Sequence, residues 1–160
     1  MNGLTIRAAA VALLAMLQGL PTTAAAADAA TIERGRYLAV TGGCNDCHTP
    51  NWPESSGQVA EADWLTGSPI GWSGPWGTSY PANLRLVVQQ FSEEDWLART
   101  ESELLPPMPW FNLARMTKED RLALYHFIRS LGPKGEAMPP ALPPGAKPTT
   151  PYFDFTPQMP

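Results

Sequence analysis

The stretch GGCNDCHTP, residues 42–50, holds both cysteines of the chain, spaced C-x-x-C, with a histidine directly behind the second. Cys44, Cys47 and His48 allow three interpretations. The pair forms a redox dithiol or disulfide, it contributes to a metal site, or it anchors haem. The rest of the chain has to discriminate among them.

The first 27 residues have the composition of an export signal. Arg7 precedes the uncharged apolar run AAAVALLAMLQGL (8–20), and the small residues up to Ala27 supply a cleavage site. That run has 13 residues, whereas a membrane-spanning helix needs about 20. We therefore expect a signal peptide at 1–27, no membrane span after its removal, and a periplasmic location in a bacterium.

The charge balance argues against nucleic acid as a partner. The chain has 11 Lys and Arg against 15 Asp and Glu, which gives a net charge of −4. A nucleic-acid-binding surface needs a basic footprint, which this composition lacks. Neither a Ser/His/Asp pattern nor a phosphate-binding loop is visible in the sequence.

The three interpretations of the cysteine motif differ in how much of it they explain. A disulfide across two intervening residues closes a very small loop and so stabilises the fold little. A catalytic dithiol is typical of βαβ units, and zinc needs four ligands, which would use every Cys and His of the chain. Haem accounts for both thiols, which add to its vinyl groups, and for the adjacent imidazole as an iron ligand. The motif favours one covalent haem c, with the dithiol and zinc readings as alternatives.

Three features make residues 31–131 resemble class I single-haem c-type cytochromes, in particular the small bacterial periplasmic members. They are CNDCH (44–48), PPMPW (106–110) and ALYHFIRSLG (123–132). The resemblance implies an all-α, class I cytochrome c fold wrapped around one haem, with electron transfer as its activity. It also implies a cytochrome c domain at 28–131, and the proline-rich tail at 132–160 lies outside the part that the resemblance covers.

Caps and periodicity predict about three helices joined by long loops. The first runs from a cap at Thr31 to the Gly42-Gly43 pair, and the second runs from a cap at Ser92 to about Thr100. The third runs from Thr117 to Leu131 and carries an apolar stripe at helical spacing. In the family that the chain resembles, a glycine on the first helix contacts an aromatic residue on the last, which here pairs Gly35 with Phe127.

Met108 is the candidate for the second axial ligand of the haem iron. Prolines at 106, 107 and 109 constrain its loop, and the resembling family carries its methionine ligand at this point before the last helix. The other candidates are Met116, Met138, Met159 and His126. A His/Met pair raises the reduction potential and leaves no open position for a substrate, so the sequence predicts an electron carrier rather than an enzyme.

Further contacts to the haem are expected from the segment that follows the motif. In the resembling family a proline carbonyl accepts the hydrogen bond of the haem histidine, which makes Pro69 and Pro75 the candidates. Buried propionates need hydrogen-bond donors. The candidates for that role are Trp76, Tyr80, Asn83 and Arg85.

The sequence also gives expectations for the conformation of the tail and for the partner proteins. Residues 132–160 contain nine prolines, which favours extended chain, and the aromatic stretch PYFDFTP (151–157) is expected to dock on the domain. The leading hypothesis is a periplasmic carrier that takes one electron from a dehydrogenase or another cytochrome and passes it to a redox partner such as a terminal oxidase. It would act as a monomer or as a complex subunit. The alternative is a haem enzyme, or the electron-accepting subunit of a periplasmic dehydrogenase, with an accessible sixth site.

Overall fold

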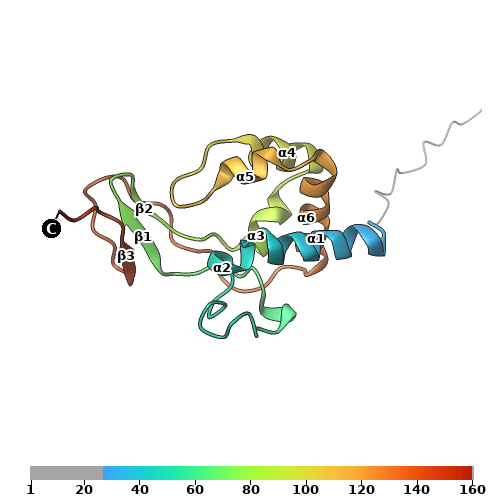
Figure 1. Ribbon diagram of the computed structural model, residues 1–160, viewed down its shortest axis with the longest axis horizontal. Helices are drawn as coiled ribbons and strands as arrows, with labels where there is room; N and C mark the ends of the chain where they lie inside the picture. The colour runs from blue at the N-terminus through green and yellow to red at the C-terminus, as the bar shows by residue number, and fades with distance from the viewer. Residues whose placement is uncertain (1–26, 160) are drawn as a thin grey trace, which may run out of the picture.

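A computed structural model describes residues 27–159, so the expected signal peptide, apart from Ala27, lies outside the described residues. A body of helices carries a small sheet that projects from one end (Figure 1). The elements in chain order are α1 (Ala29–Thr41), α2 (Cys44–His48), the 3₁₀ turn η1 (Glu61–Asp63), β1 (Gly71–Gly74), β2 (Gly77–Ser79), α3 (Leu84–Val87), η2 (Val88–Gln90), α4 (Glu93–Glu101), α5 (Trp110–Arg115), α6 (Lys118–Ser130) and β3 (Tyr152–Asp154).

Helices α1 and α6 pack against each other at very short range. A Cβ atom placed on Gly35 of α1 would lie 2.0 Å from Ala123 O and 2.6 Å from Phe127 Cβ of α6. The predicted contact between Gly35 and Phe127 is therefore confirmed. The start of α1 differs from the prediction, because the Asp28 carboxylate caps the helix by accepting a 2.7 Å hydrogen bond from the Thr31 N–H.

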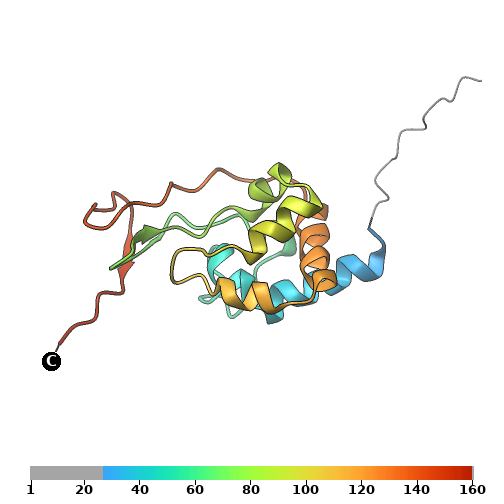
Figure 2. The ribbon, with the colours of Figure 1, turned by 90° about the horizontal axis from the view of Figure 1, so that it is seen from above.

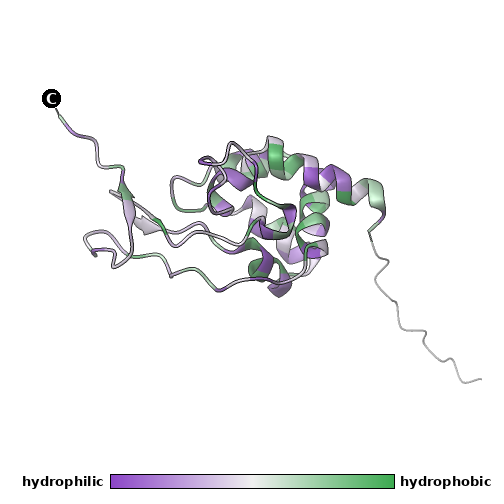
Figure 3. Cartoon of the chain, turned by 90° about the horizontal axis from the view of Figure 1, so that it is seen from below, coloured by the Kyte–Doolittle hydropathy of each residue, from purple (hydrophilic) through white to green (hydrophobic). Residues whose placement is uncertain are grey.

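The other two predicted helices are confirmed with their caps. Ser92 and Asp95 form a reciprocal capping box at the start of α4, and Thr117 accepts the N–H of Asp120 at the start of α6. The apolar stripe of α6 supplies much of the core, since Leu124 and Phe127 are each 1 % exposed. Figure 3 shows that hydrophobic residues concentrate on the helices of the body, whereas the strands and the extended tail are mostly pale or hydrophilic.

The prediction of an all-α, class I cytochrome c fold is wrong. The described residues contain a three-stranded sheet in the order β2-β1-β3 and more helices than the three expected. Strand β1 pairs with β2 in antiparallel fashion and with β3 in parallel fashion. Strand β1 lies within GSPIGWSGPWG (67–77), and β2 begins at the last residue of that stretch. The sequence predicted this segment as part of the long loops between the helices. The β1–β2 hairpin turns through Pro75 and Trp76. The first residue of β2, Gly77, has a positive φ (101°), which glycine tolerates.

The proline-rich tail is extended, and it packs back along the body before it joins the sheet (Figure 2). The Asn83 amide donates hydrogen bonds to Lys134 O and Glu136 O at 2.7 and 3.0 Å. Farther along, Thr78 and Leu142 exchange two backbone hydrogen bonds, and β3 then pairs with β1. Among residues 27–159, no helix has both the length and the apolar character needed to cross a membrane.

Candidate cofactor-attachment site

Helix α2 presents the whole cysteine motif as one short turn. Gly43 precedes it in the left-handed conformation (φ 72°), which lets the chain turn sharply from α1 into α2. Cys44 and Cys47 are three positions apart on this helix and therefore share a face. Both thiols are free and half-buried, and both line the same cavity as the His48 side chain.

The cavity of about 350 Å³ lies between α2, the 104–116 region and α6, and most of its lining is apolar. Met108 reaches it from the loop between α4 and α5, so the structure brings the four predicted thiol, imidazole and thioether groups to one space. Further apolar side chains, none of them among the site residues named from the sequence above, complete the wall. They are Trp72, Leu84, Val87, Trp96, Leu104, Leu105, Leu113, Leu124 and Ile128.

The imidazole of His48 is buried and held in one orientation. Its Nδ1–H donates a 2.7 Å hydrogen bond to Ala82 O, which leaves Nε2 as the nitrogen available to a metal. The expectation of a carbonyl from Pro69 or Pro75 is wrong. After residue 67 the chain leaves the neighbourhood of His48 to form the β1–β2 hairpin, and it comes back to the His48 side chain at Ala82. Burial lowers the pKa of His48, and the Ala82 carbonyl partly opposes this, so the ring is neutral at pH 7.

The two thiols are protonated at neutral pH. Burial raises the pKa of Cys44 to about 11, with the nearby Asp46 and Cys47 acting in the same direction. Burial also raises the pKa of Cys47. The attacking thiol of a redox dithiol needs a lowered pKa to form a thiolate. The environment of Cys44 and Cys47 raises the pKa of both thiols, so it does not favour the interpretation as a redox dithiol.

The four predicted propionate donors lie in different places. Tyr80 lines the cavity, whereas Trp76, Asn83 and Arg85 are absent from its wall. The side-chain oxygen of Asn83 caps α3, and its side-chain NH₂ group donates to the tail. The Arg85 guanidinium donates to the carbonyls of Leu131 and Gly132 at the end of α6 and to Ala62 O. Asn83 and Arg85 thus fasten the body and the tail, and of this set only Tyr80 lines the cavity. The Tyr80 hydroxyl accepts a 3.2 Å hydrogen bond from Thr150 of the tail.

The other candidates for the second axial ligand lie at different places relative to the cavity. Met116 lines the cavity with Met108, but its methyl group lies against the corner between α1 and α2, 3.5 Å from where a Cβ on Gly42 would be. Met159 is 92 % exposed. His126 sits 3.2 Å from the Glu93 carboxylate and does not line the cavity.

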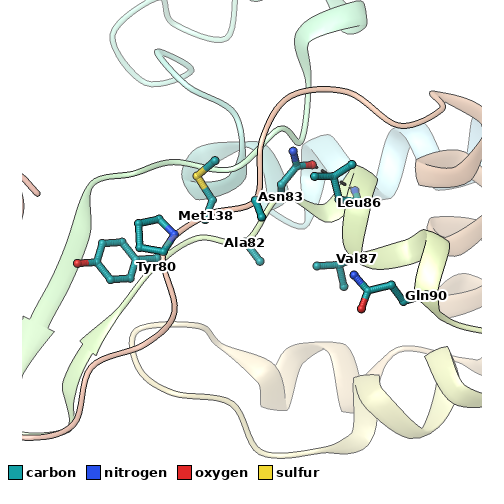
Figure 4. A pocket seen from close by; sticks show the side chains of 9 residues that line it. Tyr80, Ala82, Asn83, Leu86, Val87, Gln90 and Met138 are labelled. Atoms are coloured by element: carbon teal, nitrogen blue, oxygen red, sulfur yellow. Dashed lines mark hydrogen bonds between the residues drawn. The ribbon is translucent and has the colours of Figure 1, made fainter.

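A smaller cavity of about 150 Å³ lies beside the main one, between the 80–90 segment and the tail. Tyr80, Ala82 and Val87 contribute to the walls of both cavities. Met138 of the tail lines the smaller cavity and lies next to Ala82 (Figure 4). Tail residues therefore pack behind the carbonyl that orients His48.

The donor set fits a haem attached through thioether bonds. Two adjacent free thiols, an imidazole with Nε2 available, a thioether and a mostly apolar wall are the groups that such a macrocycle needs. No cluster of three or more His, Cys, Asp or Glu arranged to hold a metal ion occurs among the described residues.

Comparison with known proteins gives relatives of one kind. The chain is 33 % identical over 141 residues to the cytochrome c subunit of a quinone alcohol dehydrogenase of Gluconacetobacter polyoxogenes, and equally similar to that of Komagataeibacter europaeus. These relatives are cytochrome c subunits. The alignments cover 81 % of this chain but 28 % of each relative. The similarity supports a place in the cytochrome c family.

A third relative agrees with the first two. The cytochrome subunit of a fructose dehydrogenase of Gluconobacter japonicus is 29 % identical over 117 residues, which is 66 % of this chain and 22 % of that protein. The chain thus spans under a third of the length of the curated relatives that it matches. No family model matches the chain, and no solved structure matches it.

Proposed function

We propose that the chain is an exported electron-transfer protein that carries one electron on a single covalent haem c. The observation that carries the proposal is the convergence of Cys44, Cys47, His48 and Met108 on one mostly apolar cavity. Cleavage after Ala27 would release a chain whose residues 28–131 bind the haem and whose residues 132–160 form the tail. The chain would transfer electrons without changing a bond in an organic substrate.

Each of these residues has a distinct task. Cys44 and Cys47 would hold the macrocycle by thioether bonds, and His48, oriented by the Ala82 carbonyl, would bind the iron through Nε2. Met108 would supply a thioether as the second protein ligand. When bound, haem supplies an iron that alternates between Fe(III) and Fe(II). The apolar wall limits solvent access, which favours the less charged reduced state.

A dehydrogenase is the partner that the comparisons favour. The relatives are cytochrome subunits of alcohol and fructose dehydrogenases, so we propose that this chain accepts electrons from a periplasmic dehydrogenase, as a free carrier or as a complex subunit. Another cytochrome or a terminal oxidase is the proposed acceptor. Co-purification from native periplasm tests this partner directly, and a stable association with a protein of another class contradicts it.

Haem content is the first test of the proposal. We expect the protein purified from periplasm to keep a haem stain after denaturing electrophoresis, because thioether bonds survive unfolding. Pyridine haemochrome and metal analysis should give one haem and one iron per chain. A colourless band, or zinc in place of iron, contradicts the proposed function.

Replacement of Met108 tests the second axial ligand. In Met108→Ala we expect covalent haem to remain, but the far-red sulfur-to-iron absorption band of the oxidised protein should vanish. The midpoint potential should fall by more than about 59 mV, the tenfold step of a one-electron equilibrium, because a thioether favours Fe(II). Met116→Ala is the matched control, since Met116 lines the same cavity. Loss of the band in Met116→Ala with its retention in Met108→Ala would assign the ligand to Met116.

A further inference from the structure

Trp72 links the projecting sheet to the cavity. It lies in the middle of β1, between Ser79 of β2 and Phe153 of β3 in the register of the sheet. Although the sheet stands outside the helical body (Figure 1), the half-buried Trp72 side chain is part of the cavity wall. One wall of the cavity therefore depends on where the sheet holds this indole ring.

Two aromatic rings of the tail pack on Trp72. The Phe155 ring is stacked on the indole, with ring centroids 5.2 Å apart and planes 20° apart. The Phe153 ring is tilted against it, with a centroid distance of 5.6 Å. Neither phenylalanine lines the cavity, and both remain substantially exposed. The Phe155 ring centroid also lies 6.3 Å from that of Trp76, which does not line the cavity. Each aromatic pair contributes stability beyond the burial of area. Trp72 is therefore the cavity-lining ring that these two phenylalanines stabilise.

Backbone hydrogen bonds fix the tail on both sides of Trp72. Gly71 N–H donates to Pro151 O at 2.9 Å, and Phe155 N–H donates to Ser73 O at 2.7 Å. Earlier in the tail, Ala141 itself contributes to the cavity wall. The tail thus forms part of the cavity wall directly, through Ala141. It supports the wall indirectly, through the contacts of Phe153 and Phe155 with Trp72.

We propose that the C-terminal tail is a positioning element of the haem site: Phe153 and Phe155 hold Trp72 in place as a wall that keeps water from the haem. This inference rests on the proposed function. A loosened Trp72 would admit water, and water stabilises the more highly charged oxidised state. Loss of the tail contacts should therefore lower the potential and open the cavity to small ligands, while the thioether bonds stay intact.

The test uses the full chain with haem attached. In Phe153→Ala/Phe155→Ala we expect full haem content and a lower midpoint potential. We also expect cyanide to bind the oxidised protein about tenfold faster, as the loss of both aromatic pairs with Trp72 implies. Tyr152→Ala is the matched control. It removes an aromatic residue from the same strand, but side chains alternate along a strand, so Tyr152 faces away from Trp72. We expect the control to match the unaltered protein in both measurements.

Two results would overturn the inference. One is a double variant with full haem content whose potential and cyanide rate are unchanged, and the other is a Tyr152→Ala variant that shifts as far as the double variant. Should the double variant fail to fold, Phe155→Leu, which removes only the stacked ring, decides by the same two measurements. Absence of haem from the unaltered protein contradicts the proposed function itself, so the two failures are distinguishable.

Discussion

Replacement of both thiols, Cys44→Ser with Cys47→Ser, should abolish the haem stain after denaturing electrophoresis. A serine hydroxyl does not replace a thiol in the addition to a vinyl group, so no covalent bond to the macrocycle forms. Under the proposed function, His48 and Met108 would still bind the iron, but such ligand bonds do not retain haem through denaturation. Full stain intensity in this variant would refute the assignment of both cysteines.

The same variant should also lose structure. Without haem, a cavity of about 350 Å³ with mostly apolar walls loses the contacts that would fill it, and unfilled apolar volume destabilises a core. We expect lower helical content in far-ultraviolet circular dichroism and a lower yield from periplasm. Asp46→Asn is the matched control inside the motif, because Asp46 is exposed on α2. It should keep both the stain and the helical content.

Replacement of Gly35 by valine should separate α1 from α6. A Cβ at this position would lie 2.0 Å from the backbone oxygen of Ala123, and backbone does not move aside as a flexible side chain does. Overpacking of this kind costs about 3 kcal/mol or more, a large part of the roughly 5–15 kcal/mol that stabilises a typical domain. We expect the midpoint of thermal unfolding, followed by circular dichroism, to fall by about 10 °C or more.

Ala30→Val is the matched control for this effect. It adds the same β-branched side chain to the same helix at an exposed position, where surface substitutions change stability by about 0.5 kcal/mol or less. An equal fall in the midpoint of thermal unfolding of both variants would mean that valine destabilises α1 through its lower helix propensity. In that case the close contact with Ala123 would not limit this position.

Local signals explain which parts of the fold could be predicted from the sequence. The capping box at Ser92 and the Thr117 cap depend on residues within one helical turn of each other, and they predicted α4 and α6 closely. The sheet could not be predicted in this way, because β1 pairs with a strand about 80 residues later. Strands of three or four residues are also too short to show a clear alternation of polar and apolar positions.

The site residues also divide into those that local sequence signals predict and those that they do not. Cys44, Cys47 and His48 follow from a motif of adjacent residues, and Met108 follows from its proline-rich loop. The Ala82 carbonyl and Trp72 carry no such signal, because their places depend on how residues 49–82 fold back to the helical body. Asn83 and Arg85 have the chemistry of haem-facing donors, but the structure uses both to hold backbone carbonyls of distant segments.

The contact between α1 and α6 has a consequence for the order of events during maturation. The two helices that meet at Gly35 and Ala123 are separated by most of the domain, and such non-local contacts form late because loop closure must come first. The cysteine motif directly follows α1, so under the proposed export it would leave an export channel well before the residues that close the cavity. For that interval Cys44 and Cys47 would be presented on an open chain, accessible to the machinery that would join them to haem.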